Sequence, residues 1–484
     1  MDKHQAFNPF LPSWEYVPDG EPRIFGDRLY VYGSHDRFNG RGFCLNDYVC
    51  WSAPLDDLGD WRFEGTIYRK VQDPADPKGK MFMNAPDVVQ GADGRYYLYY
   101  QLAVLTCTSV AVCDTPAGKY EFYGYVEKDG RPYGRKGEPF CFDPGVLVDD
   151  DGRVWLYVGF SPAPGLLKLF MGSRGNIIDG CYCVELEPDM KTVKSGPRMV
   201  IPGPLAAFGT DFEGHGFYEA SSPRKIGGKY YLVYSSILSH ELCYAVSDTP
   251  DGDYRYGGTL VSIGDVGFEG REEPLNYTGN THGGMVQVGD QWYIFYHRQT
   301  NRQKCARQAC AEKLTIQPDG SIPQAEITSC GLNPGPLRGR GSYDARIACN
   351  LWSREGTFAY LKTFEKDRRK VHPYLTQSGQ DREDDGDQYI ANMRDGATAG
   401  YKYFVFEDLS SVSVSLRGQG RGCMELRTCP DGDPIASVEV CPEARWKRFS
   451  APVTCGISGR HALYFTYRGT GYVDFRDFTL DTDR

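Results

Sequence analysis

A β-hairpin pattern that occurs five times restricts the first 330 residues of this chain to a radial all-β fold. Each copy is a short apolar run, a turn containing glycine, and a second run that is rich in tyrosine and other strand-forming residues. Such turns between two strand-like runs predict hairpins. The turn glycines are 58 to 76 residues apart, at Gly26, Gly94, Gly152, Gly228 and Gly289.

This spacing suits a blade of four strands with its connecting loops. A blade cannot bury both of its faces alone, so repeats of this kind pack around a common axis. The 57 glycines and 30 prolines supply the turns that such a fold requires. We therefore predict a five-bladed β-propeller over residues 1–330.

The rest of the chain has a different pattern. Residues 331–345 are rich in glycine and proline, which predicts a linker. Residues 346–484 contain short, evenly spaced strand-like runs, and these favour a β-sandwich of the jelly-roll type. The whole chain is thus predicted to be all-β, a propeller followed by a sandwich.

Charge and hydropathy limit the kinds of partner molecule and the cellular location that we expect for this protein. The net charge of −10 argues against a nucleic acid or an anionic membrane as partner. The chain has no apolar run long enough for a membrane span, and its first residues lack the apolar core of a signal peptide. We expect a cytoplasmic protein whose 16 cysteines are buried free thiols rather than disulfides or metal ligands. The sequence leaves the oligomeric state open.

Polar residues precede the hairpins at a repeated distance. Asp19 and His282 lie seven residues before their turn glycines, whereas Asp143 and Glu219 lie nine before theirs. Asn84 occupies the corresponding segment of the second copy. Because the first strand of each propeller blade lines the central channel, we expect these side chains to meet at one mouth of that channel.

Converging carboxylates indicate hydrolysis of a glycosidic bond. That reaction needs one carboxylic acid to protonate the leaving oxygen and a second carboxylate to activate water or attack the sugar. A third carboxylate can raise the pKa of the acid by repulsion between like charges. Each acidic residue alone could be a turn or strand-entry residue, so the repeated position is what favours catalysis.

At these positions the sequence resembles glycoside hydrolase family 43, across almost all of residues 6–330. The segments that carry the resemblance are Asn8–Pro12 with Asp19, Phe142–Pro144, Phe217–Ser222 and Asn280–Gly284. It implies a five-bladed propeller in which Asp19 is the general base and Glu219 the general acid. It also implies that Asp143 adjusts the pKa of the acid.

The resemblance further implies an inverting enzyme that releases α-L-arabinofuranosyl or β-D-xylosyl residues from oligosaccharides derived from plant hemicellulose. Inversion requires about 6.5–9.5 Å between the two working carboxyl groups. We expect Asn84, His215, His282 and Arg298 to contact the sugar. No cofactor is expected to be required, although in many members the axial histidine, here His282, helps to hold a calcium ion or a water.

Several alternatives stay open. Glu21 competes with Asp19 for the role of base, because the family usually has Asp-Pro where this chain has Asp-Gly-Glu-Pro. Asn84 replaces the usual aromatic residue. His215 could be an ordinary loop residue and Arg298 a structural arginine. The rival functions are a retaining fructosyl-type hydrolase and a propeller that binds sugar without cleaving it.

The C-terminal part, residues 346–484, resembles a family 6 carbohydrate-binding module. The matching segments include Tyr374–Gln377, Asp387–Asn392 and Gly396–Tyr401. Such a sandwich either binds sugar or only supports the propeller. We expect Trp446 to be a packing residue, because no pair of exposed aromatic residues brackets it in the sequence.

Overall fold

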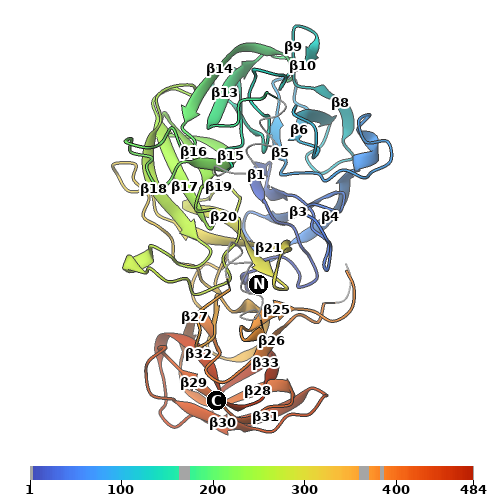
Figure 1. Cartoon of the computed structure of the whole chain (residues 1–484). Helices are drawn as coiled ribbons and strands as arrows, with labels where there is room; N and C mark the ends of the chain where they lie inside the picture. The colour runs from blue at the N-terminus through green and yellow to red at the C-terminus, as the bar shows by residue number, and fades with distance from the viewer. Residues whose placement is uncertain (1–3, 163–174, 359–369, 382–385, 483–484) are drawn as a thin grey trace.

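The computed structural model describes residues 4–162, 175–358, 370–381 and 386–482, and its regular structure is almost entirely β (Figure 1). This confirms the all-β prediction. Five antiparallel sheets surround a common centre, and two further sheets form a separate body beside them. Three short 3-10 helices interrupt the strands of the described residues: η1 (Lys70–Gln72), η2 (Phe268–Gly270) and η3 (Ala345–Ile347).

Each blade of the propeller is a meander of consecutive strands. The first blade contains β1 (Glu21–Phe25), β2 (Arg28–Tyr32), β3 (Tyr48–Pro54) and β4 (Arg62–Tyr68), and the second contains β5 (Asp87–Gln90), β6 (Tyr96–Tyr100), β7 (Ser109–Cys113) and β8 (Glu121–Tyr125). A small hairpin of β9 (Glu127–Lys128) and β10 (Arg131–Pro132) follows.

The remaining blades continue in chain order. The third contains β11 (Gly145–Val148), β12 (Val154–Gly159), β13 (Cys181–Leu186) and β14 (Val193–Ile201), and the fourth contains β15 (Phe217–Ile226), β16 (Lys229–Ser236), β17 (Glu241–Ser247) and β18 (Arg255–Ser262). The fifth has β19 (Met285–Val288), β20 (Gln291–Thr300) and β21 (Gln303–Leu314). Each of the five predicted hairpins is the first strand pair of one blade.

The first strands of the blades form the inner ring. Strand β1 contacts β5 and β19, and β11 contacts β5 and β15. Five apolar clusters lie between neighbouring blades, and one of them joins the fifth blade to the first. Strand β2 shows why the strands are apolar on both faces: Leu29 and Val31 belong to the cluster shared with blade five, whereas Tyr30 and Tyr32 belong to the cluster shared with blade two.

The N-terminal segment completes the ring. The described fifth blade has three strands, and the segment before blade one lies along its outer strand β21. The Phe10 N–H donates to the Ala309 carbonyl at 3.3 Å, and Asn8 Nδ2 donates to the Ala311 carbonyl at 2.8 Å. The Phe10 ring packs against Phe295, with their centroids 5.4 Å apart. The start of the chain therefore fastens the last blade to the first.

The C-terminal body is a sandwich of two six-stranded sheets. One sheet contains β22 (Leu337–Arg338), β24 (Asn350–Trp352), β27 (Thr398–Phe406), β29 (Arg421–Arg427), β30 (Ala436–Val440) and β32 (Gly459–Thr470). The other contains β23 (Gly341–Asp344), β25 (Tyr374–Thr376), β26 (Tyr389–Met393), β28 (Leu409–Gly418), β31 (Lys447–Pro452) and β33 (Val473–Thr482). One apolar core fills the space between them.

Two details differ from the sequence predictions. Strands β22 and β23 lie inside 331–345, the predicted linker, because Leu337 and Tyr343 are buried in the sandwich core. The cysteines are free thiols, as expected, and most are buried, but Cys429, Cys441 and Cys455 are exposed on the sandwich. Among the described residues, no helix is long and apolar enough to cross a membrane.

We predict that closure of the ring depends on Phe10. Replacing this nearly buried ring with alanine leaves a cavity between blades one and five. Phe10→Ala should lower the free energy of unfolding by about 3–5 kcal/mol, as measured by denaturant titration. The control is Phe208→Ala, because Phe208 is 80% exposed and its loss should change the stability by no more than about 0.5 kcal/mol. Equal effects of the two variants would contradict this role of Phe10.

Candidate active site

Two of the predicted aspartates adopt unusual backbone conformations just before the inner strands. Asp19 precedes β1 and has φ 57°, and Asp143 precedes β11 and has φ 46°. Aspartate tolerates this left-handed region better than most residues, and strained conformations of this kind are concentrated at functional sites. Glu219 lies in β15 at a β-bulge, where the register with β16 shifts on both sides of it. Bulges of this kind re-aim a side chain.

The segments of Asp19 and His282 meet because two glycines allow a close approach. Gly20 and Gly283 form a parallel β-bridge between the first and fifth blades. A Cβ atom at Gly283 would lie 1.9 Å from the Phe295 carbonyl oxygen, so a larger residue would clash with the backbone. Residues 263 positions apart in the chain are thereby placed side by side.

Asp19 is held by Arg307, a residue of β21 that is 2% exposed. Its guanidinium donates from Nη1 to Asp19 Oδ1 at 2.8 Å, and from Nε and Nη2 to the two oxygens of Asp36 at 2.9 and 3.0 Å. Burial alone would raise the pKa of Asp19, but the charge of Arg307, together with smaller contributions from His297, His282 and Ser34, lowers this pKa below its usual range. Asp19 is therefore a carboxylate at neutral pH.

His297 supports the same carboxylate as a neutral ring. The Asp19 backbone N–H donates to His297 Nδ1 at 3.2 Å, and the opposite nitrogen, Nε2, lies 2.8 Å from the Asn280 carbonyl. Nδ1 is thus an acceptor and Nε2 the donor. Burial and the nearby Arg307 lower the pKa of His297 to about 3, in agreement with this assignment.

Asp143 and His282 form a buried pair. His282 Nδ1 lies 3.5 Å from Asp143 Oδ2, and both residues are more than nine-tenths buried. Burial opposes the charge on His282, but its hydrogen bond with Asp143 and the charge of that carboxylate raise the pKa of His282 to about 9. His282 is therefore a cation at neutral pH, whereas burial raises the pKa of its partner Asp143.

The pKa of Glu219 is shifted in the opposite direction to that of Asp19. Burial, followed by the negative charge of Asp143, raises the pKa of Glu219 to about 8, with a smaller contribution of the same sign from Asp19. The charge of His282 acts in the other direction. Charge interactions thus link Glu219 with Asp143, Asp19 and His282, the other three predicted residues of this buried group. One carboxyl group there is ionised and another is protonated at the same pH.

Glu21, the rival of Asp19, forms its ion pairs with a different set of residues. Its carboxylate accepts from Arg224 Nη2 at 2.5 Å and from Ser222 Oγ at 3.0 Å, and lies 3.4 Å from Arg23 Nη2. Arg23 also forms a bidentate pair with Asp87, at 3.0 and 2.6 Å. These ion pairs join β1, β5 and β15 across the axis, and they pair the Glu21 carboxylate with arginine side chains.

Two of the predicted sugar-binding residues, Asn84 and Arg298, lie in different parts of the structure. Asn84 is partly exposed at the start of blade two, and its amide nitrogen donates to Gln101 Oε1 at 2.5 Å. Arg298 points toward the sandwich, where it donates to the carbonyls of Ala348 and Arg346 at 3.0 and 2.8 Å. Arg298 thus joins the two bodies and is not part of the carboxylate cluster.

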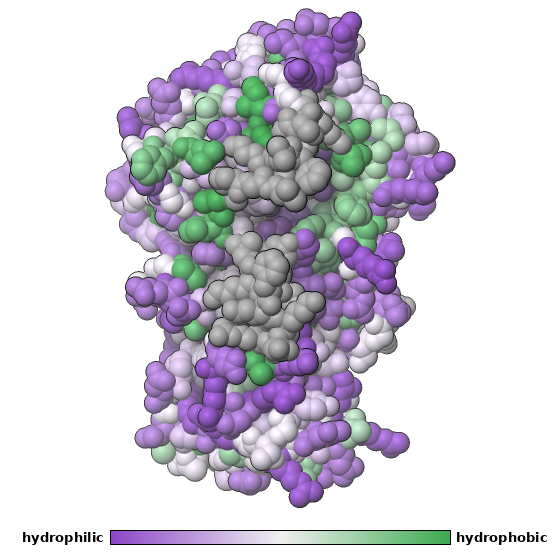
Figure 2. Space-filling view, in the orientation of Figure 1, coloured by the Kyte–Doolittle hydropathy of each residue, from purple (hydrophilic) through white to green (hydrophobic). Residues whose placement is uncertain are grey.

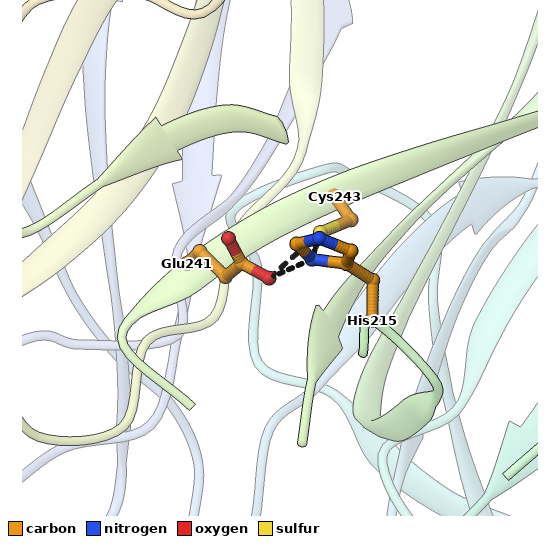
Figure 3. A group of neighbouring side chains, drawn as sticks. All are labelled: His215, Glu241 and Cys243. Atoms are coloured by element: carbon orange, nitrogen blue, oxygen red, sulfur yellow. Dashed lines mark hydrogen bonds and ion pairs between the residues drawn. The ribbon is translucent and has the colours of Figure 1, made fainter. Parts of the chain in front are cut away.

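His215 lies beside blade four rather than in the carboxylate cluster (Figure 3). Its Nδ1 is 2.7 Å from Glu241 Oε1, and its ring stacks on Tyr256 at a centroid distance of 4.9 Å. The side chain is 32% exposed. Although burial opposes it, hydrogen bonds from His215 and Ser236 lower the pKa of Glu241 to about 2. This pair holds His215, whose side chain stays partly exposed.

The described residues offer two places where a metal ion could be considered. Cys243 Sγ lies 3.2 Å from Glu241 Oε1 and 4.0 Å from His215 Nδ1, but the 2.7 Å contact between His215 and Glu241 is the length of a hydrogen bond (Figure 3). At the axis, calcium would need six to eight oxygen ligands, whereas His282 is a cation that faces Asp143. Both groups fit ion pairs better than metal sites.

Arg307 was not among the predicted site residues, because the face of the sheet on which it lies depends on the register of β20 with β21. His297 and Gln299 lie on one face of β20, and Arg298 lies on the other; the register pairs Gln299 with Arg307 and Arg298 with Gln308. Arg307 therefore shares the face of His297. The available signal was an arginine in a run of small apolar residues of β21, since a buried guanidinium requires carboxylate partners.

Apolar side chains are exposed on segments at the same end of the blades. The propeller face turned to the viewer in Figure 2 shows several such side chains. Phe82 lies before β5, and Leu205 and Phe208 lie between β14 and β15, in the segments that lead to Asn84 and Glu219. These segments offer apolar surface outside the buried carboxylates.

Comparison with known proteins agrees with this geometry. Residues 15–322 match the family model "Glycosyl hydrolases family 43". The chain is 50% identical to a xylosidase/arabinosidase of Thermoclostridium stercorarium over 99% of this chain and 100% of that protein. It is 28% identical to a β-xylosidase of Xylanibacter ruminicola over 59% of this chain and 88% of the other.

Solved structures show the same fold. An arabinoxylan arabinofuranohydrolase of Bacillus subtilis, in complex with cellotetraose, is 20% identical, with a TM-score of 0.50 over 97% of this chain and 96% of that chain. A β-xylosidase/α-arabinofuranosidase from a compost metagenome, in complex with xylotriose, is 24% identical, with a TM-score of 0.52 over 67% of this chain and 98% of the other.

The pKa of Glu219 predicts a pH-dependent stability. The folded protein keeps this carboxyl protonated up to a pH of about 8, whereas the unfolded chain ionises it near its usual value of 4.5. The wild type should therefore lose stability relative to Glu219→Gln as the pH rises between these values. We expect the variant to be more stable above pH 8, by a few kcal/mol at about 1.4 kcal/mol for each pKa unit.

Urea unfolding of both proteins from pH 4 to pH 9 measures this difference. The matched control is Glu272→Gln at an exposed position, which should show no such trend. A stability difference between Glu219→Gln and wild type that stays constant over this range would contradict the raised pKa of Glu219.

Proposed function

We propose that this chain, which belongs to glycosyl hydrolase family 43 and is a glycosidase acting on xylosyl and arabinofuranosyl residues, cleaves its substrate by inversion at the buried carboxylates. The observation that carries the roles of base and acid is the separation of two pKa values, that of Asp19 being lowered and that of Glu219 raised to about 8. Inversion is what the resemblance of these segments to the family implies. Groups whose surroundings separate their pKa values are suited to act as base and acid.

Asp19 acts as the general base. Arg307 keeps it ionised and leaves it free to accept a proton from a water molecule. As that proton moves to Asp19, the water oxygen forms a bond with the anomeric carbon of the sugar, and the bond from this carbon to the leaving oxygen breaks.

Glu219 acts as the general acid. Its proton passes to the leaving oxygen as the glycosidic bond breaks, so the departing sugar leaves as a neutral alcohol. Asp19 then returns its proton to solvent, and Glu219 takes one up. Asp143 keeps Glu219 protonated before the reaction, and His282 balances the charge of Asp143 and fixes its position.

The ion pairs of Glu21, Arg23, Asp87 and Arg224 join three blades across the axis. In this proposal, the network limits the site to a terminal sugar rather than a passing polymer. The enzyme therefore releases single xylosyl or arabinofuranosyl units from hemicellulose oligosaccharides. His215, whose side chain is partly exposed, is a candidate contact to the next sugar.

The sandwich supports the propeller in this proposal. Trp446 lies near two guanidinium groups, 4.4 Å from that of Arg417 and 5.1 Å from that of Arg476, so it packs rather than offering a free face to a sugar. The resemblance to a carbohydrate-binding module and the cytoplasmic location stay predictions. So does a calcium ion at the axis, through which no step of the proposed reaction passes.

Two substitutions distinguish the acid from the base. Glu219→Gln cannot donate a proton, so its activity on xylobiose should fall by about 10²–10⁴-fold. The loss should be smaller on nitrophenyl xyloside, whose leaving group needs less protonation. Asp19→Asn should lose activity on both substrates to a similar extent, because every substrate needs an activated water. Steady-state kinetics of the purified variants measures these ratios.

Circular dichroism spectra like that of the wild type are the control for folding of both variants, and the exposed Glu272→Gln should keep full activity. Undiminished activity of Glu219→Gln would exclude it as the acid and would favour a propeller that only binds sugar or uses another residue.

The stereochemistry of the product tests inversion. Proton NMR during the first minutes of hydrolysis of a β-xyloside should show α-xylose before mutarotation. Initial release of β-xylose would instead indicate a retaining mechanism and a covalent intermediate.

A further inference from the structure

The sandwich contacts the propeller at residues that neighbour Asp36, the carboxylate that binds Arg307. We propose that Asp381 and Gln377 of the sandwich are positioning residues for the general base Asp19, acting through Asp36 and Arg307. This inference rests on the proposed function of Asp19. Neither sandwich residue touches the carboxylate cluster directly, so the argument follows the hydrogen bonds from one to the next.

The first connection starts at Asp381. Its Oδ1 accepts from the Phe38 backbone N–H at 2.9 Å, and its Oδ2 lies 3.4 Å from Asn46 Nδ2. The same Asn46 nitrogen donates to the Asp36 carbonyl at 3.0 Å. One carboxylate of the sandwich thus contacts two points of the segment between β2 and β3, Phe38 and Asn46.

The second connection starts at Gln377. Its Oε1 accepts from the Tyr16 hydroxyl at 2.6 Å. The backbone carbonyl of Tyr16 in turn accepts from the Asp36 N–H at 2.9 Å, and the Tyr16 ring stacks on Phe38 at a centroid distance of 5.6 Å. Both connections therefore reach the backbone of Asp36 from different directions.

The position of Asp36 affects the general base Asp19 through Arg307. Its two oxygens bind Arg307 in bidentate fashion, and the third bond of that guanidinium goes to Asp19. A bidentate pair fixes the plane of the guanidinium as well as its distance. A shift of Asp36 therefore turns Arg307 and changes its contact with Asp19.

The sandwich also holds the hairpin that carries Arg307. The Asn301 N–H, at the tip between β20 and β21, donates to the Leu375 carbonyl at 2.7 Å, and Thr376 Oγ1 donates to Asn301 Oδ1 at 2.9 Å. Asn301 Nδ2 donates in addition to Asn39 Oδ1 at 2.7 Å. The sandwich thus restrains both partners of the pair between Asp36 and Arg307.

The test is the pH profile of kcat/KM in the full-length enzyme. If Asp381→Ala loosens the contact between Arg307 and Asp19, the base loses part of its stabilising positive charge. The acid limb of the profile should then move upward by about one pH unit, which is a loss of about tenfold at pH values below that limb. The alkaline limb, which reports Glu219, should stay in place.

Two milder substitutions and a control test the same contacts. Asp381→Asn keeps an oxygen for the Phe38 N–H and should shift the acid limb less than Asp381→Ala. Tyr16→Phe removes only the hydroxyl that binds Gln377 and should shift it in the same direction. The control Asp395→Ala removes an ion pair with Arg354 inside the sandwich and should leave the profile unchanged.

An unchanged acid limb in both Asp381→Ala and Tyr16→Phe would overturn the inference, even if activity falls uniformly, because a uniform loss indicates a structural role only. This failure is distinct from failure of the proposed function, which would appear as undiminished activity of Asp19→Asn.

Discussion

The closure of the propeller ring is the constraint on which the active site depends. Every blade is apolar on both faces, so no blade is stable until it has a neighbour on each side. Closure requires the segment of Phe10 to lie along β21 and the first blade to pack on the fifth. The same closure brings Asp19, near the start of the chain, against His282 and Arg307 near the end of the propeller. The free energy gained by burying apolar surface thus offsets the cost of bringing together charged groups that would not otherwise meet.

Within this frame, the roles of the carboxyl groups are decided by their neighbours rather than by residue type. Asp19 and Glu219 are both buried, and burial alone would protonate both of them. The guanidinium of Arg307 keeps Asp19 ionised, whereas Glu219 has the carboxylate of Asp143 as its strongest charged neighbour and becomes protonated. A rigid β-scaffold is suited to this purpose, because a small displacement of one charged group would change the ionisation of the other.

Repetition explains which features could be predicted from the sequence. The blades repeat, so the position of Glu219 and His282 relative to their hairpins was sufficient to predict that they converge. Features without repetition were harder to predict. Arg298 and Arg307 differ in the face of the sheet they occupy, which depends on the register of β20 with β21, and register is set by pairing rather than by composition. The strands inside 331–345 were hidden by glycine and proline, because their apolar residues are buried only by strands distant in the chain.

The charges around the axis also suit the reaction. Apart from Glu219, the ion pairs described at the axis join five acidic groups to four basic ones, so acidic groups are in excess by one: Asp19, Glu21, Asp36, Asp87 and Asp143 against Arg23, Arg224, Arg307 and His282. A negative site stabilises the positive charge that develops on the sugar in the oxocarbenium-like transition state. The charge of His282 limits this effect. Without it, Glu219 would face a more negative site, and in the proposed reaction it would release its proton to the leaving oxygen less readily. The buried histidine therefore lets one cluster both stabilise a cation and release a proton.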